Sequence, residues 1–293
     1  MRKNVKMVLV TIGIIIAIII GFSLFTFILS IKPPKLGNYR TPIGFGLAYE
    51  NVSFKNSDGL TLKGFFIPAK NKSNATIIVG HGYPFSKSDV LIFAPFLAKK
   101  YNLLFFDFRY FGESQGKYTT VGWKEQEDVL AALDYLKTRK DIDKSKIGAI
   151  GLSLSASTFI MATEKTSDIK AIVADSPYSS LDKMIERTYF IFPSITKLPF
   201  VWLTKLYAKI FFNIDTKEIS PKKSIKEIKI PVLLIHGEKD SQIPVENSKT
   251  LYEASNKNLT ELWIIKDADH GYSYAINKKE YEKRVLDFFE KNL

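Results

Sequence analysis

Residues 7–31 form a run of 25 residues without a charged side chain, and this run limits what the N-terminus can become. About 20 apolar residues are enough for an α-helix to cross the hydrocarbon core of a membrane. A helix packed on a soluble domain would not need to be apolar on every side. We therefore expect a membrane-spanning helix over residues 7–31, preceded by a short cytoplasmic segment over residues 1–6.

A cleaved signal peptide is the alternative for this run. Such a peptide has an apolar region of about 7–15 residues and ends in small residues before its cleavage site. The segment TFILSIKPP offers no such site, which favours an uncleaved anchor. Arg2, Lys3 and Lys6 precede the run and favour a cytoplasmic N-terminus, whereas Lys32 and Lys35 on the other side weaken this asymmetry. We expect the bulk of the chain that follows to be extracytoplasmic, tethered to the cell membrane.

The net charge of +12 raises the question of nucleic-acid binding. Half of the excess lies within residues 1–40, beside the apolar run, and the rest is mostly lysine interleaved with acidic residues. The sequence has no basic stripe with interleaved aromatic residues, so we expect no nucleic-acid partner. It also has no cysteine, which excludes a disulfide and a cysteine nucleophile.

Beyond a Pro-containing linker over residues 32–48, short apolar segments alternate with amphipathic ones. This alternation is typical of an α/β fold with a mainly parallel sheet flanked by helices. Residues 51–69 are expected to form a hairpin around Asp58-Gly59. Further strands are expected near residues 75–80, 102–108, 146–151, 169–175, 230–237 and 261–268, and helices over 88–100, 122–138, 155–165, 245–255 and 278–291. One domain over residues 49–293 accounts for all of them.

The connection between the strand ending at Asp175 and the strand near Ile230 has over fifty residues, too many for a simple crossover. Residues 189–214 within it are strongly aromatic and apolar. We expect an inserted cap over about residues 180–225, covering the active-site end of the sheet. An ordinary crossover helix packed on the core is the alternative.

Ser153 lies in the stretch IGAIGLSLSASTF, where a predicted strand ends at Gly151 and a helix begins near Ser155. A strained turn of this kind lifts the serine hydroxyl above the carboxyl end of the sheet. The start of the helix directs backbone N–H groups at a developing oxyanion, and the N–H of Leu154 is expected to be one donor. A serine-rich helix cap is the alternative, because Ser155 and Ser157 also lie at the helix start.

A serine nucleophile needs a base, and the base needs a carboxylate that orients it. His270, in DADHGYS, follows the last predicted strand, and Asp240, in LLIHGEKDSQIP, follows the strand before it. The chain order Ser153, Asp240, His270 is the order expected of an α/β-hydrolase. A surface-loop histidine and a turn-capping aspartate are the structural alternatives.

The other two histidines, His81 and His236, each precede a glycine at a strand end. We expect their side chains to be hydrogen-bonded turn residues rather than bases. The loop that contains His81 is expected to supply the second oxyanion donor, the backbone N–H of Tyr83. Three histidines in separate loops do not have the spacing of an HExxH metal site, so neither a metal nor a cofactor is expected.

The motifs VGHGYP, FFDFRYFGES, GWKEQEDVLAALDYL, IGLSLSA, ADSPYSS, LLIHGEKDSQIP and DADHGYS resemble those of the α/β-hydrolase superfamily. Within it, the chain resembles membrane-anchored bacterial hydrolases of the Bem46-like and serine-aminopeptidase-like groups, over roughly residues 50–293. The resemblance implies that Ser153, Asp240 and His270 form a catalytic triad and that Tyr83 and Leu154 supply the oxyanion hole.

The resemblance also implies that residues 107–114 brace a strand against the rim of the active site. Ser155 departs from the G-x-S-x-G pattern, whose last position is a glycine. The expected function is that of a membrane-anchored serine hydrolase that cleaves carboxylic esters with an apolar or lipid-like part through an acyl-enzyme. A peptidase of the serine-aminopeptidase-like type and a non-catalytic binding protein on the same fold are the alternatives, and the sequence leaves the oligomeric state open.

Overall fold

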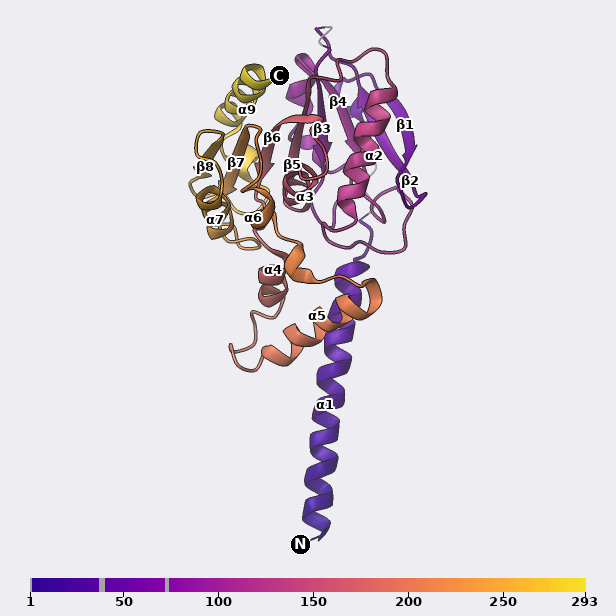
Figure 1. Cartoon of the computed structure of the whole chain (residues 1–293), viewed down its shortest axis with the longest axis vertical. Coiled ribbons are helices and arrows are strands. Elements are labelled where there is room, and N and C mark those ends of the chain that lie inside the picture. The colour runs from indigo at the N-terminus through magenta and orange to yellow at the C-terminus, as the bar shows by residue number, and fades with distance from the viewer. Residues whose placement is uncertain (1, 37–39, 72–73) are drawn as a thin grey trace. The chain divides into compact units, whose positions relative to one another are not determined.

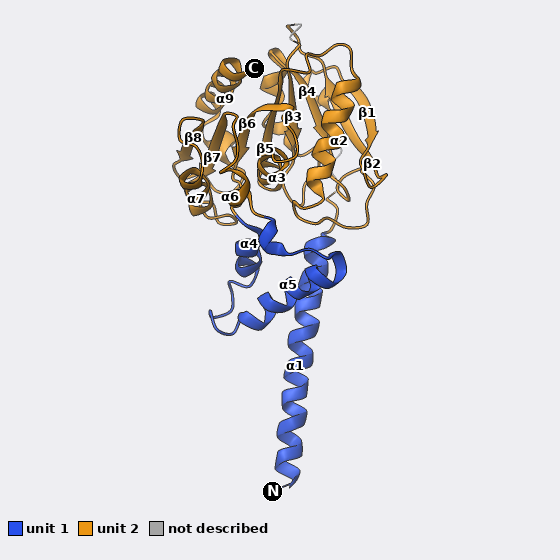
Figure 2. Cartoon of the chain, viewed as in Figure 1, with its two compact units in different colours: residues 1–33, 180–219 blue, residues 34–179, 220–293 orange. Residues whose placement is uncertain are grey.

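The computed structural model describes residues 2–36, 40–71 and 74–293 (Figure 1). The chain divides into two compact units (Figure 2). The hydrolase unit comprises residues 34–179 and 220–293, and the helical unit comprises residues 1–33 and 180–219. Two segments far apart in the sequence therefore fold together in the helical unit.

An eight-stranded sheet forms the centre of the hydrolase unit, in the order β1-β2-β4-β3-β5-β6-β7-β8. The strands are β1 (Glu50–Lys55), β2 (Thr61–Ile67), β3 (Thr76–Gly80), β4 (Asn102–Phe106), β5 (Ile147–Leu152), β6 (Ile169–Asp175), β7 (Val232–Gly237) and β8 (Thr260–Ile265). β1 and β2 form the expected antiparallel hairpin, β2 is antiparallel to β4, and all other neighbours are parallel. This is the α/β-hydrolase fold, and it confirms the predicted fold class and strands.

Both faces of the sheet are covered, which explains why its central strands are apolar throughout. Ile77 and Val79 belong to a core shared with Val285 and Phe289 of α9 (Lys278–Asn292). The other face is covered by α2 (Glu125–Thr138) and α3 (Leu154–Ala162), which lie over the sheet in Figure 1. The short α6 (Pro221–Ser224), α7 (Glu246–Ala254) and α8 (Ser273–Ile276) complete the unit.

The α-helix predicted over residues 88–100 is wrong in type. The structure has two short 3₁₀ segments there, Val90–Ile92 and Pro95–Lys99. Pro95 has no backbone N–H to donate, and its ring disfavours a helical conformation of Ala94. The apolar spacing that suggested a helix is used instead to bury Leu91 and Leu97.

The helical unit consists of α1 (Arg2–Ile31), α4 (Leu181–Thr188), α5 (Leu198–Phe212) and a 3₁₀ turn at Thr216–Glu218. α1 is long and apolar enough to cross a membrane. The predicted linker, residues 32–48, ends in a 3₁₀ turn at Pro42–Phe45, and its residues 37–39 lie outside the described residues.

Candidate active site

Ser153 stands at the turn between β5 and α3 with a left-handed backbone, φ 57° and ψ −109°. A non-glycine residue in this region is strained, and such strain is typical of functional sites. The turn is fixed by the amide of Ser153, which donates to the carbonyl of Asp175 at 2.8 Å. Among the described residues, the Ser153 hydroxyl makes no helix-capping hydrogen bond, which argues against the helix-cap alternative.

Ser155 occupies the position where the G-x-S-x-G pattern has its last glycine, and its surroundings explain why a serine fits there. A Cβ atom at Gly80 would lie 2.4 Å from the Cβ of Ser155, and one at Gly151 would lie 2.8 Å from its hydroxyl. These two glycines are paired across β3 and β5 and so leave room for the larger residue. The Ser155 hydroxyl accepts from the amide of Leu152 at 2.8 Å and is fully buried, so it ties the turn together.

Asp240 and His270 lie together, on the loops that follow β7 and β8. Asp240 Oδ2 and His270 Nδ1 are 2.7 Å apart, which is a hydrogen bond of good length. The other carboxylate oxygen accepts from the amides of Gln242 at 3.0 Å and Ile243 at 2.7 Å. The carboxylate is therefore held in one orientation and in turn orients the imidazole ring through its Nδ1.

A second histidine contacts the same carboxylate. His236 Nε2 lies 3.3 Å from Asp240 Oδ2 and 2.7 Å from the carbonyl of Ile243, while its Nδ1 lies 2.6 Å from the hydroxyl of Ser248. Burial alone would raise the pKa of Asp240, but hydrogen bonds from His236 and His270, together with the charge of His270, lower it below its usual range. Asp240 is therefore an anion when it meets His270.

The neighbours of His270 in the sequence are occupied elsewhere. Asp269 Oδ1 accepts from the amide and the hydroxyl of Ser241, at 2.8 and 2.9 Å, and from the amide of His270 at 2.7 Å. Asp267 pairs with Lys239 at 2.5 Å. Neither Asp267 nor Asp269 is paired with the imidazole ring of His270. The ring pairs instead with Asp240, which is thirty residues away in the sequence.

Two loops approach the turn at Ser153. A Cβ atom at Gly82 would lie 3.4 Å from the Cβ of Ser153, so the loop that carries Tyr83 runs beside the serine. A Cβ atom at Gly271 would lie 3.7 Å from the Leu152 side chain, which brings the histidine loop to the residue before the serine. Leu154 is the first residue of α3, where backbone N–H groups have no partner within the helix.

His81 stabilises the loop that carries Tyr83 through hydrogen bonds at both ring nitrogens. Its Nε2 accepts from the amide of Phe108 at 3.1 Å, so Nδ1 carries the proton and donates to the carbonyl of Gly82 at 2.8 Å. Complete burial lowers the pKa of His81, which keeps the ring neutral. The structure thus confirms that the side chains of His81 and His236 are hydrogen-bonded, although His236 belongs to β7 and not to a turn.

Asp175 is a buried carboxylate whose role the sequence did not reveal. Standing at the end of β6, it accepts from the hydroxyls of Ser273 at 2.9 Å and Ser176 at 3.1 Å through Oδ1, and from Tyr281 at 3.2 Å through Oδ2. Ser273 follows His270 by three residues. The carboxylate therefore braces the histidine loop against the strand next to β5.

Residues 107–114 brace the other side of the site, as their resemblance to known hydrolases implied. Asp107 accepts from the amide of Lys87 at 2.7 Å and from its ammonium group at 2.6 Å. Arg109 donates to Asp128 through both Nε and Nη2, and to Asp58 at 2.6 Å. The buried pair with Asp128 joins the loop to α2, and the partly exposed pair with Asp58 joins it to the hairpin.

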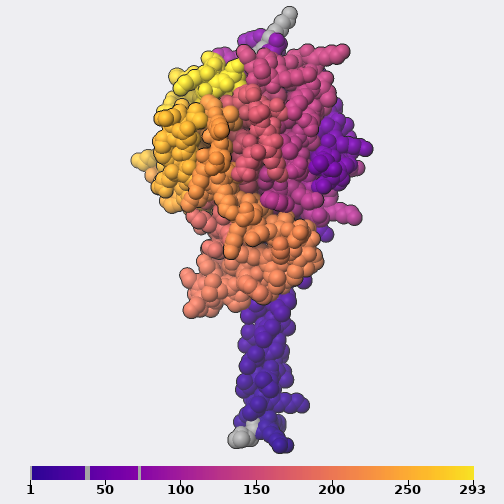
Figure 3. Space-filling view, viewed as in Figure 1, coloured from indigo at the N-terminus to yellow at the C-terminus, as the bar shows by residue number. Residues whose placement is uncertain are grey.

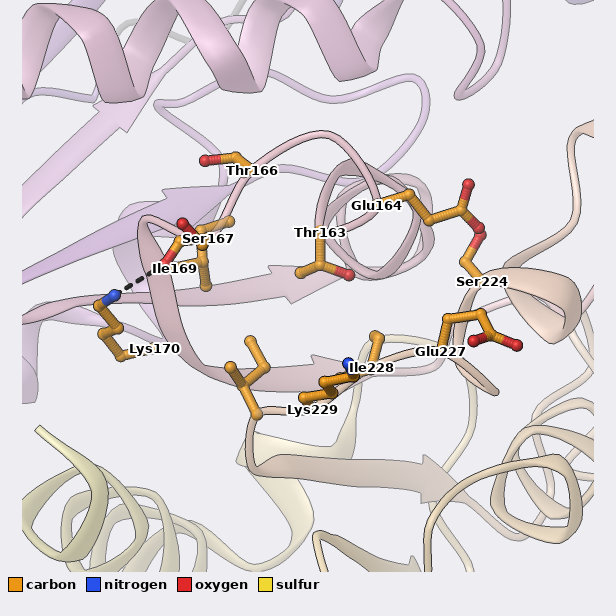
Figure 4. Close-up of a pocket in the computed structure, with 11 residues that line it drawn as sticks. Thr163, Glu164, Thr166, Ser167, Ile169, Lys170, Ser224, Glu227, Ile228 and Lys229 are labelled. Atoms are coloured by element: carbon orange, nitrogen blue, oxygen red, sulfur yellow. Dashed lines mark hydrogen bonds between the residues drawn. The ribbon is translucent and has the colours of Figure 1, made fainter.

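The hollow drawn in Figure 4 lies elsewhere on the hydrolase unit. Its lining comes from the end of α3, from Thr163 and Glu164, from the start of β6 at Ile169, and from residues 224–230 before β7. Lys170 points its ammonium group to the carbonyl of Ser167 at 2.7 Å there. Since Ser153 follows the carboxyl end of β5, this hollow is at the opposite edge of the sheet and is not the site of the chemistry.

The eight-stranded sheet, the strained serine turn and the paired aspartate and histidine define a hydrolase of the α/β type. The chain belongs to the prolyl oligopeptidase family, which matches residues 113–293. That segment contains Ser153, Asp240 and His270.

Two proteins of similar length and one longer protein are similar to this chain. The protein YqkD of Bacillus subtilis is 30% identical over 238 residues, which cover 79% of this chain and 76% of YqkD. The esterase Pf2001 of Pyrococcus furiosus is 33% identical in sequence and has a TM-score of 0.72, covering 89% of this chain and 99% of the esterase. The acylaminoacyl peptidase of Pyrococcus horikoshii shares the fold, with a TM-score of 0.64 and 21% identity over 88% of this chain and 44% of the peptidase.

Proposed function

We propose that this protein is a membrane-anchored serine hydrolase that cleaves carboxylic esters through an acyl-enzyme. The observation that carries the proposal is the position of Ser153 at a left-handed turn above the sheet, in a unit where Asp240 and His270 are 2.7 Å apart. Ser153 is the nucleophile, His270 the base and Asp240 the residue that orients the base.

The proposed reaction has two halves. In the first, Ser153 Oγ attacks the ester carbonyl while His270 Nε2 takes its proton, and the C–O bond to the alcohol breaks as His270 returns that proton to the leaving oxygen. In the second, water attacks the acyl-enzyme while His270 takes its proton, and the bond between the acyl carbon and Ser153 Oγ breaks as His270 returns that proton to the serine oxygen, which releases the acid. The backbone N–H groups of Tyr83 and Leu154 are the proposed donors to the oxyanion in both halves.

An ester is the preferred substrate because the esterase Pf2001 matches this chain over nearly its whole length at 33% identity. The aromatic and apolar segment 189–212 and the apolar α1 favour an ester with an apolar acyl chain or a lipid-like alcohol. No cofactor takes part in this scheme.

A peptidase is the second candidate, favoured by the match of residues 113–293 to the prolyl oligopeptidase family. The same triad can cleave an amide, provided that His270 protonates the leaving amine. Esters of p-nitrophenol with rising acyl length, assayed beside aminoacyl anilides on the full chain in detergent, distinguish the two. A higher kcat/KM for long-chain esters supports the esterase, and a preference for anilides supports the peptidase.

The nucleophile is tested with a fluorophosphonate probe, which labels an activated serine. Ser153→Ala should abolish labelling, whereas Ser155→Ala is the matched control two residues away and should keep it. If labelling persists in Ser153→Ala and disappears in Ser155→Ala, Ser155 is the nucleophile and the assignment to Ser153 is wrong. If the wild-type chain neither reacts with the probe nor cleaves any substrate, it is a non-catalytic binding protein.

The membrane anchor is the remaining part of the proposal and rests on α1, with Arg2, Lys3 and Lys6 before the span. The chain should remain at full length in the membrane fraction, and protease added to intact cells should digest residues 34–293. Protection of these residues until lysis would reverse the orientation. A shortened soluble form would mean that residues 1–31 act as a signal peptide.

A further inference from the structure

Residues 189–212 expose large apolar side chains although they belong to a folded unit. Phe190, Ile195, Trp202 and Ile210 are 73%, 78%, 63% and 65% exposed. The sequence has no Asp or Glu between residues 189 and 214, so these side chains are not interleaved with the acidic residues typical of a helix in water. Large apolar side chains exposed together in one segment are typical of a binding or membrane surface.

The opposite side of α5 packs on α1. The rings of Phe22 and Phe200 lie 5.6 Å apart, and those of Phe27 and Tyr207 lie 5.7 Å apart. The Tyr207 hydroxyl donates to the carbonyl of Ile20 at 3.1 Å. In Figure 3 the orange atoms of this segment cover the indigo atoms of the C-terminal part of α1, while its N-terminal part stands clear of them.

These contacts determine where α5 lies along the axis of α1. At 1.5 Å per residue, Ile19 lies about 20 Å and Phe27 about 32 Å along the helix from Lys6, the last charge before the apolar run. The hydrocarbon core of a bilayer is about 30 Å thick. If α1 crosses the membrane with Lys6 at one surface, the side chains that pack on residues 19–27 lie in the last third of that core and at its far edge.

Polar side chains of α1, α4 and α5 have hydrogen-bond or ion-pair partners inside the helical unit, as a site without water requires. The Tyr189 hydroxyl lies 2.6 Å from the hydroxyl of Thr26 and 2.7 Å from that of Thr204. Lys205 pairs with Asp182 at 2.8 Å. Lys209 is exposed seven residues after Trp202, on the same helix face, and its side chain is long enough to extend from an apolar surface to a polar one.

We propose that residues 189–212 lie in the bilayer beside α1, in the half nearer the C-terminal end of that helix, and that lipid acyl chains cover Phe190, Ile195, Trp202 and Ile210. The inference rests on the proposed membrane span of α1. The helical unit is then a membrane-embedded unit rather than a single-helix anchor with a water-facing cap.

The absence of cysteine from the sequence gives a direct test in the full chain. Single cysteines are introduced at exposed positions, labelled with an environment-sensitive fluorophore and reconstituted in phosphatidylcholine–phosphatidylglycerol vesicles with or without a nitroxide-labelled acyl chain. Ile14→Cys tests the span of α1, and Phe190→Cys and Trp202→Cys test residues 189–212. Lys144→Cys, on the exposed surface of the hydrolase unit, is the control in water.

The nitroxide lipid should quench the label at positions 14, 190 and 202, by about half or more at depths inside the hydrocarbon core, and leave position 144 bright. Quenching at position 14 without quenching at positions 190 and 202 would overturn the inference while leaving the anchor intact. No quenching at position 14 would overturn the anchor, and the inference with it.

Discussion

The hydrolase unit and the helical unit use their apolar side chains in opposite ways. In the hydrolase unit, Ile78, Phe105 and Leu234 are completely buried between a sheet and its helices. In the helical unit, Phe190 and Trp202 are 73% and 63% exposed although α5 is well formed. The first unit is therefore stabilised by burial within the chain, and the second depends on what surrounds it.

The two units also differ in how they pair their polar side chains. The hydrolase unit buries charges in pairs, as in Arg109 with Asp128 and Lys87 with Asp107, and uses them to hold the loops of the site. The helical unit has mainly hydroxyl contacts between its elements, such as Thr26 with Tyr189. Substitutions in the first unit should therefore affect the fold and the chemistry directly. Under the proposed membrane placement, substitutions in the second unit should act through its contact with lipid.

The largest difference is expected between two glycines. Gly80→Ala places a Cβ 2.4 Å from Ser155 Cβ, and because the core cannot make room, the free energy of unfolding should fall by about 3 kcal/mol. Gly21→Ala in α1 has no described heavy atom within 4 Å of the new Cβ and should leave the unfolding temperature unchanged. Thermal unfolding in one detergent measures both. Equal melting temperatures would mean that the turn at Ser153 is not packed tightly against β3.

Asp175→Ala should have the next largest effect, on catalysis. Loss of its bonds to Ser273 and Tyr281 frees the loop of His270, so kcat should fall about tenfold or more while KM changes little. Asp175→Asn keeps an acceptor and should recover part of the activity. Asp134→Ala is the control on the exposed surface of α2. An unchanged kcat in Asp175→Ala, with a lower melting temperature, would reduce Asp175 to a purely structural residue.

The smallest effect is a dependence of stability on pH. The pKa of Asp240 is lowered in the folded chain, so its charge contributes stability above its ordinary pKa, and this contribution is lost as the pH falls through the lower folded value. The difference in free energy of unfolding between the wild type and Asp240→Asn should shrink as the pH falls below about 4. Urea unfolding at several pH values measures it. A difference that grows as the pH falls below about 4 would contradict the lowered pKa.

Strand positions were predictable from the sequence because the central strands are apolar on both faces and end at glycine or polar residues. Periodicity was a poorer guide where proline intervened: Pro95 prevented the helix expected over residues 88–100. The pairing of α1 with α5 joins segments nearly 180 residues apart and left no local pattern from which it could be predicted.

In the site, the pairing of Asp240 with His270 followed from the order of the strands, because parallel strands end at one edge of the sheet. The contact of His236 with Asp240 could not be foreseen, since it depends on how the loop after β7 folds back on its own strand. The role of Asp175 was hidden because an acidic residue at a strand end is also common in turns. Ser155 fits only because Gly80, on a different strand, lies opposite Gly151.

The central claim is that Asp240 orients His270 for a serine nucleophile, and kcat of Asp240→Asn on the best ester tests it most directly. Loss of the orienting carboxylate should lower kcat by about 10⁴-fold with little change in KM, because the imidazole is left in the wrong tautomer. Asp267→Asn, whose carboxylate pairs with Lys239 on the surface, should keep the wild-type kcat. If Asp240→Asn folds normally and retains a kcat near that of the wild type, Asp240 is not the acid of the triad and the proposed mechanism is wrong.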